Sequence, residues 1–109
     1  MVKSTITYTG DLHCTAQHGP SGARLETDAP TDNQGLGESF SPTDLVATAL
    51  GSCILTVMGI MARRLEVDLT GAVADIEKEM ATDPIRRIGK VSVKITVPTK
   101  VSLENQTKL

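Results

Sequence analysis

Two cysteines are the residues of this chain whose side chains are natural nucleophiles. Cys53 lies in the middle of SPTDLVATALGSCILTVMGIMARRL, the segment from Ser41 to Leu65, and residues 45–62 of that segment carry no charge. Cys14 lies 39 residues earlier, in a short segment of mixed polarity. A thiolate is a nucleophile, whereas a buried thiol serves as a small apolar side chain. Both roles are open for Cys53.

The spacing of the cysteines and histidines argues against a disulfide framework and against a metal site. Two cysteines so far apart and in unlike contexts match neither pattern. His13 and His18 have no carboxylate or cysteine at a ligand spacing. We therefore expect no metal and no cofactor.

A reactive Cys53 requires a cation supplied by another part of the fold. A free thiol has a pKa of about 8.5. Cys53 is the twelfth residue of the expected helix, about 16 Å from its start at about 1.5 Å per residue, too far for the helix dipole to act. Apolar neighbours such as Leu50 and Val57 would raise the pKa of the thiol further. Arg24 is the first candidate for the cation, with a solvated strand residue as its alternative role, and Arg64 at the helix end is a poorer one.

The start of this helix has complete capping chemistry. Ser41 is a favourable N-cap, Pro42 suits the first helical position, and Asp44 completes an S-x-x-D sequence similar to a capping box. We expect the helix to run from Pro42 to about Leu65. Asp44 precedes Cys53 by nine residues, which places the two on opposite sides of a helix. Asp44 is therefore more typical of a cap than of an acid that orients an arginine.

The helix is apolar on all sides, which is typical of a protein core or a membrane. Its 18 uncharged residues lie at the lower limit for spanning a bilayer, and Phe40 is the only aromatic residue near either end. We expect no membrane partner and a helix almost fully buried in the assembled protein. One chain of this size has too little material to cover it, so we expect an obligate homodimer, with close helix approach at Ala47 and Gly51 and at Ser52 and Thr56.

The other segments predict strands and turns. Residues 5–9, 12–17 and 23–27 favour three strands, and residues 28–39, rich in glycine, proline, aspartate and asparagine, favour a long loop. Residues 67–80 favour a strand with a bulge near positions 73–74, and residues 90–98 alternate cleanly as another strand. Ser102 is a candidate N-cap of a second helix, within which we expect the chain to end. The length predicts one domain over residues 1–109.

Composition excludes several classes of function. The net charge is −2, the isoelectric point is near 5.6, and only one tyrosine and one phenylalanine are present. These values argue against a nucleic-acid partner, which requires a basic surface or stacking aromatic residues. The first ten residues contain no apolar run, so we expect no signal peptide and a cytoplasmic location.

The order of these elements resembles the OsmC/Ohr family, in its OsmC-like branch. SPTDLVATALGSC is similar to the family segment that carries the peroxidatic cysteine, and DPIRRIGKVSVKITVP is similar to the hairpin that follows. The resemblance implies an α+β fold with antiparallel sheets wrapped around a buried central helix, in an intertwined dimer in which both subunits build each active site. It also implies reduction of organic hydroperoxides through a sulfenic acid, with a second cysteine closing a disulfide.

The resemblance assigns roles to particular residues. Cys53 falls on the attacking cysteine, and Arg24 is the only arginine of the N-terminal strands from which the family takes its activating arginine. The position of the family's glutamate holds Thr43, and the acid stands one residue later, at Asp44. The second cysteine would lie beyond Leu109, which suggests a C-terminally truncated member and an external thiol reductant.

Two functions therefore stay open. The first is thiol-dependent reduction of organic hydroperoxides through Cys53, as an oxidoreductase of oxidative-stress defence. The second is a non-catalytic OsmC-like protein that binds a small hydrophobic ligand in an apolar pocket.

Overall fold

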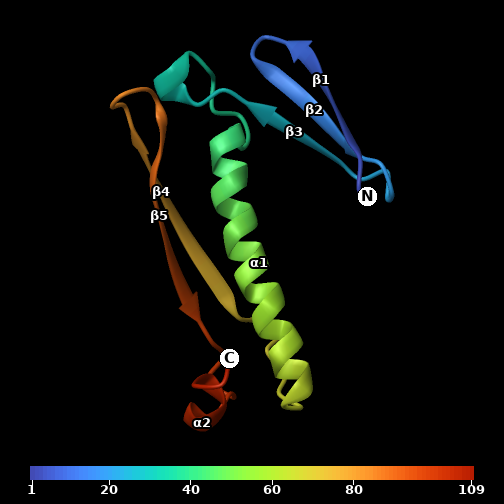
Figure 1. Ribbon diagram of the computed structural model, residues 1–109, viewed down its shortest axis with the longest axis vertical. Coiled ribbons are helices and arrows are strands. Elements are labelled where there is room, and N and C mark those ends of the chain that lie inside the picture. The colour runs from blue at the N-terminus through green and yellow to red at the C-terminus, as the bar shows by residue number, and fades with distance from the viewer. The chain divides into compact units, whose positions relative to one another are not determined.

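The computed structural model describes all residues from 1 to 109, and the chain forms two compact units, residues 1–45 and residues 46–109 (Figure 1). Each unit is described by itself. The expectation of a single domain stays a prediction.

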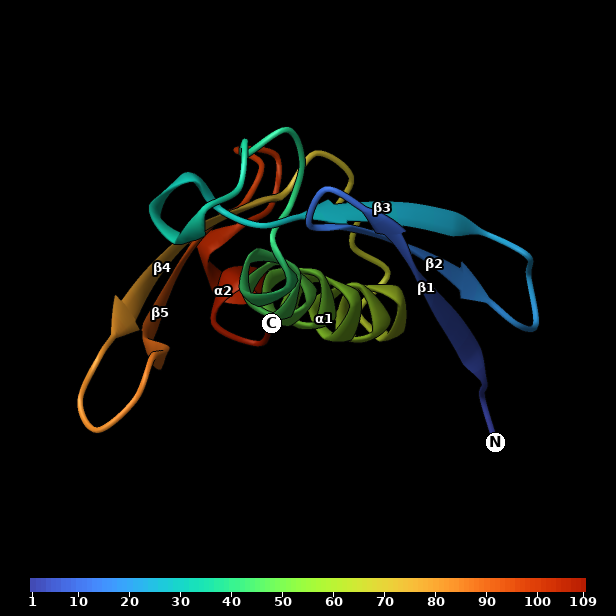
Figure 2. The same cartoon turned by 90° about the horizontal axis from the view of Figure 1, so that it is seen from above.

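The first unit is built on a three-stranded antiparallel sheet (Figure 2). Its strands are β1 (Ser4–Gly10), β2 (His13–His18) and β3 (Arg24–Asp28), paired in that order. The turn between β1 and β2 places three successive residues in the left-handed region, with φ of 99° at Gly10, 52° at Asp11 and 64° at Leu12. Glycine at the first of these positions avoids the steric cost of a side chain there. The three predicted strands are confirmed.

The loop predicted over residues 28–39 contains one short 3₁₀ helix, η1 (Thr31–Asn33). Backbone hydrogen bonds hold the loop to the sheet, because the amide of Asp28 donates to the carbonyl of Phe40 at 3.0 Å and the amide of Ala29 donates to that of Leu12 at 3.2 Å. The loop also folds tightly on itself at Gly35, where a Cβ atom would lie only 1.7 Å from the carbonyl oxygen of Ala29. Glycine is required at that position.

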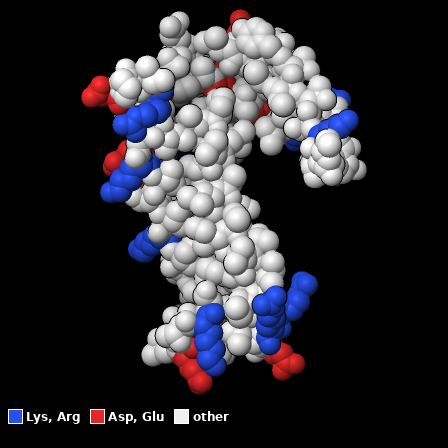
Figure 3. Space-filling view, in the orientation of Figure 1, with Lys and Arg blue, Asp and Glu red and all other residues white.

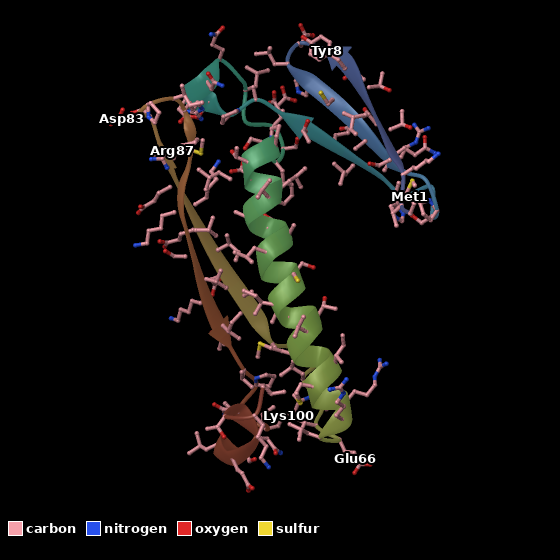
Figure 4. All side chains as sticks on the ribbon, in the orientation of Figure 1. Met1, Tyr8, Glu66, Asp83, Arg87 and Lys100 are labelled. Carbon is pink, nitrogen blue, oxygen red and sulfur yellow. The ribbon has the colours of Figure 1, made fainter.

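The second unit contains most of α1 (Pro42–Arg64), the hairpin of β4 (Val73–Ala81) and β5 (Arg87–Thr96), and the short α2 (Leu103–Gln106). The hairpin turn is fixed by Arg87, whose Nε and Nη2 donate to the carbonyl of Asp83 at 3.2 Å and 3.1 Å (Figure 4). Ser102 caps α2 as predicted, since its Oγ accepts from the amide of Asn105 at 3.2 Å. The α+β class with antiparallel sheets is confirmed.

The segment after α1 differs from its prediction. Residues 67–72 are not strand, because the helix ends in a left-handed cap at Glu66, with φ of 56°, and the amide of Val67 donates back to the carbonyl of Ala62 at 2.8 Å. This bonding pattern closes a helix and redirects the chain. The bulge predicted near positions 73–74 is also wrong, since the register shift lies between Glu79 and Met80.

One face of α1 contacts the hairpin at Gly51. A Cβ atom at Gly51 would lie 2.7 Å from Cδ1 of Ile76 and 3.6 Å from Cβ of Ala74, both on β4. The sequence reasoning assigned the small residues Ala47 and Gly51 to a contact between two helices. For Gly51 the structure corrects this, because its missing side chain admits a strand of its own chain.

The remainder of α1 is largely exposed within the single chain. Three of its residues are buried, Ala47, Gly51 and Ala62. Figure 3 shows the middle of the helix without charged side chains on the visible face, while its last turn carries Arg63 and Arg64. By length and composition alone α1 is apolar enough to cross a membrane, a test that the core helix of a soluble protein also passes. The expected burial of α1 in the assembled protein stays a prediction.

The contact between Gly51 and β4 is testable with two glycine substitutions in the same helix. We expect Gly51→Leu to lower the free energy of unfolding by about 1–3 kcal/mol, because the new side chain must displace Ile76. A Cβ atom at Gly59 meets nothing within 4 Å, so Gly59→Ala should stabilise the helix by up to about 1 kcal/mol. Urea unfolding of both variants measures the difference, and equal midpoints would contradict the packing described.

Candidate functional site

Cys53 lies at the centre of an exposed apolar stripe along α1. Residues 46, 50, 53, 57 and 60 follow one another at intervals of four and three, which places them on one face of a helix. Val46, Leu50, Val57 and Ile60 keep between 44% and 59% of their surface exposed, and Cys53 is exposed as well. We call these five residues the Cys53 stripe. The prediction that apolar neighbours bury the thiol is wrong for the single chain.

The helix start that precedes Cys53 is a reciprocal capping box. The amide of Asp44 donates to Oγ of Ser41 at 3.1 Å, and the amide of Ser41 donates to Oδ2 of Asp44 at 3.0 Å. Ser41 is 1% exposed, so both of its polar groups need these partners. The capping role predicted for Asp44 is confirmed. Its second candidate role, in a catalytic site, stays a prediction.

Arg24, the predicted activating cation, lies at the start of β3 in the first unit. Its Nη2 donates to Oε1 of Gln17 at 3.4 Å, and its side chain lines an open hollow of about 250 Å³ on the sheet together with threonines of β1 and β2. Cys53 lies in the second unit. The pairing of Arg24 with Cys53 therefore stays a prediction.

Cys14 occupies a different environment from Cys53. It is half-buried on β2, where it pairs with Tyr8 of β1 and Thr27 of β3. This position in the middle of a regular sheet suits a structural side chain.

Two open hollows flank α1, one against the hairpin and one against residues 67–72. The first has a volume of about 430 Å³ and the second of about 450 Å³. The first is lined by Thr48, Gly51, Ser52, Leu55, Thr56, Ala74 and Ile76. The second is lined in part by the charged residues Arg63 and Asp68. Hollows of this size are large enough for a small ligand.

A cluster that the sequence reasoning missed joins His13, Asp28 and Glu38. The Nε2 atom of His13 lies 3.5 Å from Oδ1 of Asp28, and Oδ2 of Asp28 accepts from the amide of Glu38 at 2.9 Å. Burial lowers the pKa of His13, but the hydrogen bond to the carbonyl of Asp11 and the charges of Asp28 and Glu38 outweigh it and raise this pKa above its usual value. The pKa of Asp28 is held below its usual value, chiefly by the amide of Glu38.

No sequence spacing could have revealed this cluster. Its members are 15 and 10 residues apart, and they meet because the antiparallel register pairs His13 directly with Asp28. The loop after β3 then returns to the sheet, so that the amide of Glu38 donates to Oδ2 of Asp28. Only a correct register for β2 and β3 would have given the signal.

Comparison with known proteins decides the family. The family described as OsmC-like protein matches residues 35–109, which include all of α1, the hairpin and α2. The chain belongs to the OsmC-like family. A crystal structure from Psychrobacter arcticus 273-4, described as that of an osmotic stress induced and detoxification response protein, is 48% identical to this OsmC-like chain. The two superpose with a TM-score of 0.90, over 98% of this chain and 77% of that one. No curated protein matches.

These comparisons confirm the predicted family and fold. The segment from Ser41 to Cys53, on which the resemblance was based, lies within the matched residues. The OsmC-like fold therefore places Cys53 on the long helix, where the sequence predicted it.

The capping box predicts a stability loss that is specific to Ser41. We expect Ser41→Ala to lower the free energy of unfolding by about 1 kcal/mol, because the amide of Asp44 loses its acceptor. Ser39→Ala is the matched control, since the hydroxyl of Ser39 makes one long hydrogen bond of 3.4 Å at the surface. The control should change stability by less than about 0.5 kcal/mol. Thermal unfolding distinguishes the two, and an equal loss in both variants would contradict the cap.

Proposed function

We propose that this OsmC-like protein is a thiol-dependent reductase of organic hydroperoxides, with Cys53 as the attacking residue. The observation that carries the proposal is the exposed position of Cys53 at the centre of an apolar stripe on the long helix of the family. Cys53 does not lie on the face of α1 that contacts the hairpin, where Gly51 is buried against β4.

The proposal includes a homodimer in which a second copy covers the Cys53 stripe. The spacing of four and three residues is that of a helical contact seam. Leaving Val46, Leu50, Val57 and Ile60 in water would be costly, because burying such a side chain contributes about 1.5–3 kcal/mol. A second copy offers the same stripe and a matching lack of charge. Both subunits then contribute walls to the space around each Cys53.

The chemistry assigned to Cys53 is a displacement at oxygen. The thiolate attacks the distal oxygen of the hydroperoxide, the O–O bond breaks, and the alkoxide leaves and takes up a proton to become an alcohol. Cys53 is left as a sulfenic acid, and a second thiol condenses with it to form a disulfide and water. An external dithiol then reduces the disulfide. Arg24 is the proposed cation that stabilises the thiolate and the developing alkoxide.

Apolar walls around Cys53 favour a substrate with a hydrocarbon tail over hydrogen peroxide. Each buried CH₂ group contributes about 0.8 kcal/mol to binding. The Psychrobacter arcticus protein is described as an osmotic stress induced and detoxification response protein, and for this chain we propose cytoplasmic defence against oxidative stress.

A second function is favoured by the two hollows along α1. A non-catalytic protein that binds a small hydrophobic ligand would use the hollow between Leu55, Ala74 and Ile76, and the state of Cys53 would not matter to it.

Substitution of the two cysteines separates these functions. We expect Cys53→Ser to abolish consumption of cumene hydroperoxide in the presence of a dithiol, because serine cannot form a sulfenic acid. Cys14→Ser is the matched control and should retain most of the rate. Arg24→Ala should slow the reaction if that guanidinium stabilises the thiolate, while Arg64→Ala should leave it unchanged. Failure of the wild-type protein to consume any organic hydroperoxide would overturn the peroxidase and favour ligand binding.

The dimer is tested by placing a charge in the stripe. We expect the wild-type protein to have about twice the 11.6 kDa mass of the chain in light scattering. Leu50→Glu and Val57→Glu should dissociate it, because a buried carboxylate without a partner is strongly unfavourable. Ile85→Glu, at an exposed position of the hairpin turn, is the control and should leave the mass unchanged. A monomeric wild-type protein at micromolar concentration would rule the dimer out.

A further inference from the structure

We propose that His13, Asp28 and Glu38 form a binding site for a divalent transition-metal cation, with Zn²⁺ as the best-suited ion. All three residues belong to the first unit, so the site is defined within one compact part of the chain. It is independent of the proposed reaction at Cys53.

The geometry of the three side chains suits a single small ion. One ligand atom from each of the three lies within 4.8 Å of the other two. The distance from Nε2 of His13 to Oδ1 of Asp28 is 3.5 Å. Ligands at about 2.0–2.1 Å from a tetrahedral Zn²⁺ are separated by about 3.4 Å. One imidazole and two carboxylates leave a fourth position open for water.

The hydrogen bond on the other side of the imidazole determines which of its nitrogens can bind a metal. Nδ1 of His13 lies 2.7 Å from the carbonyl oxygen of Asp11. A carbonyl can only accept, so Nδ1 must carry a proton. Nε2 of a neutral ring would then be an acceptor 3.5 Å from Oδ1 of Asp28, and two acceptors lie this close when a cation stands between them. A backbone carbonyl that orients a histidine in this way is the usual outer partner of a metal ligand.

The burial of Asp28 is the second and independent observation. Asp28 is 1% exposed, and its Oδ1 is a buried atom without a hydrogen-bond partner. Leaving such an oxygen unpaired is costly, so it requires a partner of opposite charge. Its other oxygen is occupied by the amide of Glu38, which fixes the carboxylate in place.

Two cations satisfy this arrangement, a proton on Nε2 or a metal ion. The negative charge of Glu38 favours either cation, but only a metal ion can take its carboxylate as a third ligand. Because Glu38 is exposed, the ion can enter from solvent. A bound ion would tie the loop over residues 29–40 to the sheet, immediately before the capped start of α1.

Calorimetric titration of the purified protein with Zn²⁺ tests the proposal. We expect one equivalent to bind at neutral pH, and His13→Gln and Glu38→Gln should each weaken binding by at least the 10- to 100-fold that loss of an outer partner causes. His18→Gln is the matched control, because His18 is an exposed strand histidine bonded to Ser21. It should bind Zn²⁺ as the wild-type protein does. Zn²⁺ should also raise the melting temperature of the wild-type and His18→Gln proteins, but not of His13→Gln.

The thiols need their own control, because they also bind Zn²⁺. A protein with both Cys14→Ser and Cys53→Ser should retain the site, and loss of binding there would overturn the proposal. Equal binding by His13→Gln, or an equal loss in His18→Gln, would do the same. Absence of binding in the wild-type protein, with a His13 ring that titrates by NMR, would show that the cation is a proton. None of these measurements uses peroxide turnover, so the site stands or falls separately from the proposed function.

Discussion

The long helix α1 has more apolar surface than its own chain can cover. The hairpin of β4 and β5 takes one face, where Gly51 allows close contact with Ile76. The opposite face, from Val46 to Ile60, is left with its apolar side chains in solvent. The hydrophobic effect makes such a surface a contact site. Cys53 lies in the middle of it, so whatever covers the helix also decides the environment of the thiol.

The proposed reactivity of Cys53 depends on this arrangement. The helix dipole does not reach Cys53, which lies about three turns from the helix start. Residues 45–62, which surround Cys53 in the sequence, contain no charged side chain that could activate it. Activation must therefore come from a separate element, and the proposed dimer provides both a dry enclosure and a second set of strands. In a low-dielectric enclosure a single arginine has a larger effect on a thiolate than it has in water. The proposed dimer and the proposed reaction therefore depend on each other, because the dimer supplies the enclosure in which the thiolate is stabilised.

Much of the fold follows from local sequence chemistry. Ser41, Pro42 and Asp44 start α1 where the sequence predicted, and alternation gave the strands near both ends. The predicted start of the strand after α1 was wrong, because a backbone conformation determines where the helix ends. Glu66 ends the helix in a left-handed cap that no residue type announces, and the strand therefore starts at Val73 rather than at position 67. The role of Gly51 was decided by packing. Apolar periodicity alone could not show whether this glycine contacts a strand of its own chain or the helix of a second subunit.

The site was predictable in part. Cys53 was identified as the candidate from a segment that resembles the family's, because a cysteine on a capped apolar helix is a strong local pattern, and its role stays a prediction. The cluster of His13, Asp28 and Glu38 was missed, because it depends on strand register and on the return of a long loop. The role of Arg24 could not be predicted from the sequence. That role depends on whether its side chain meets Cys53, and the residues around Arg24 in its strand contain no information about this.

The central claim, that covering the Cys53 stripe creates the reactive site, is tested most directly by trapping the oxidised thiol. Wild-type protein and Leu50→Glu, at equal concentration, would be treated with cumene hydroperoxide and a dione reagent that captures sulfenic acids, and each cysteine would be quantified by peptide mass spectrometry. The account predicts rapid trapping at Cys53 in the dimeric wild-type protein, slow trapping at Cys53 in the monomeric variant, and little at Cys14 in either. Equal rates at Cys53 in the two proteins would contradict it.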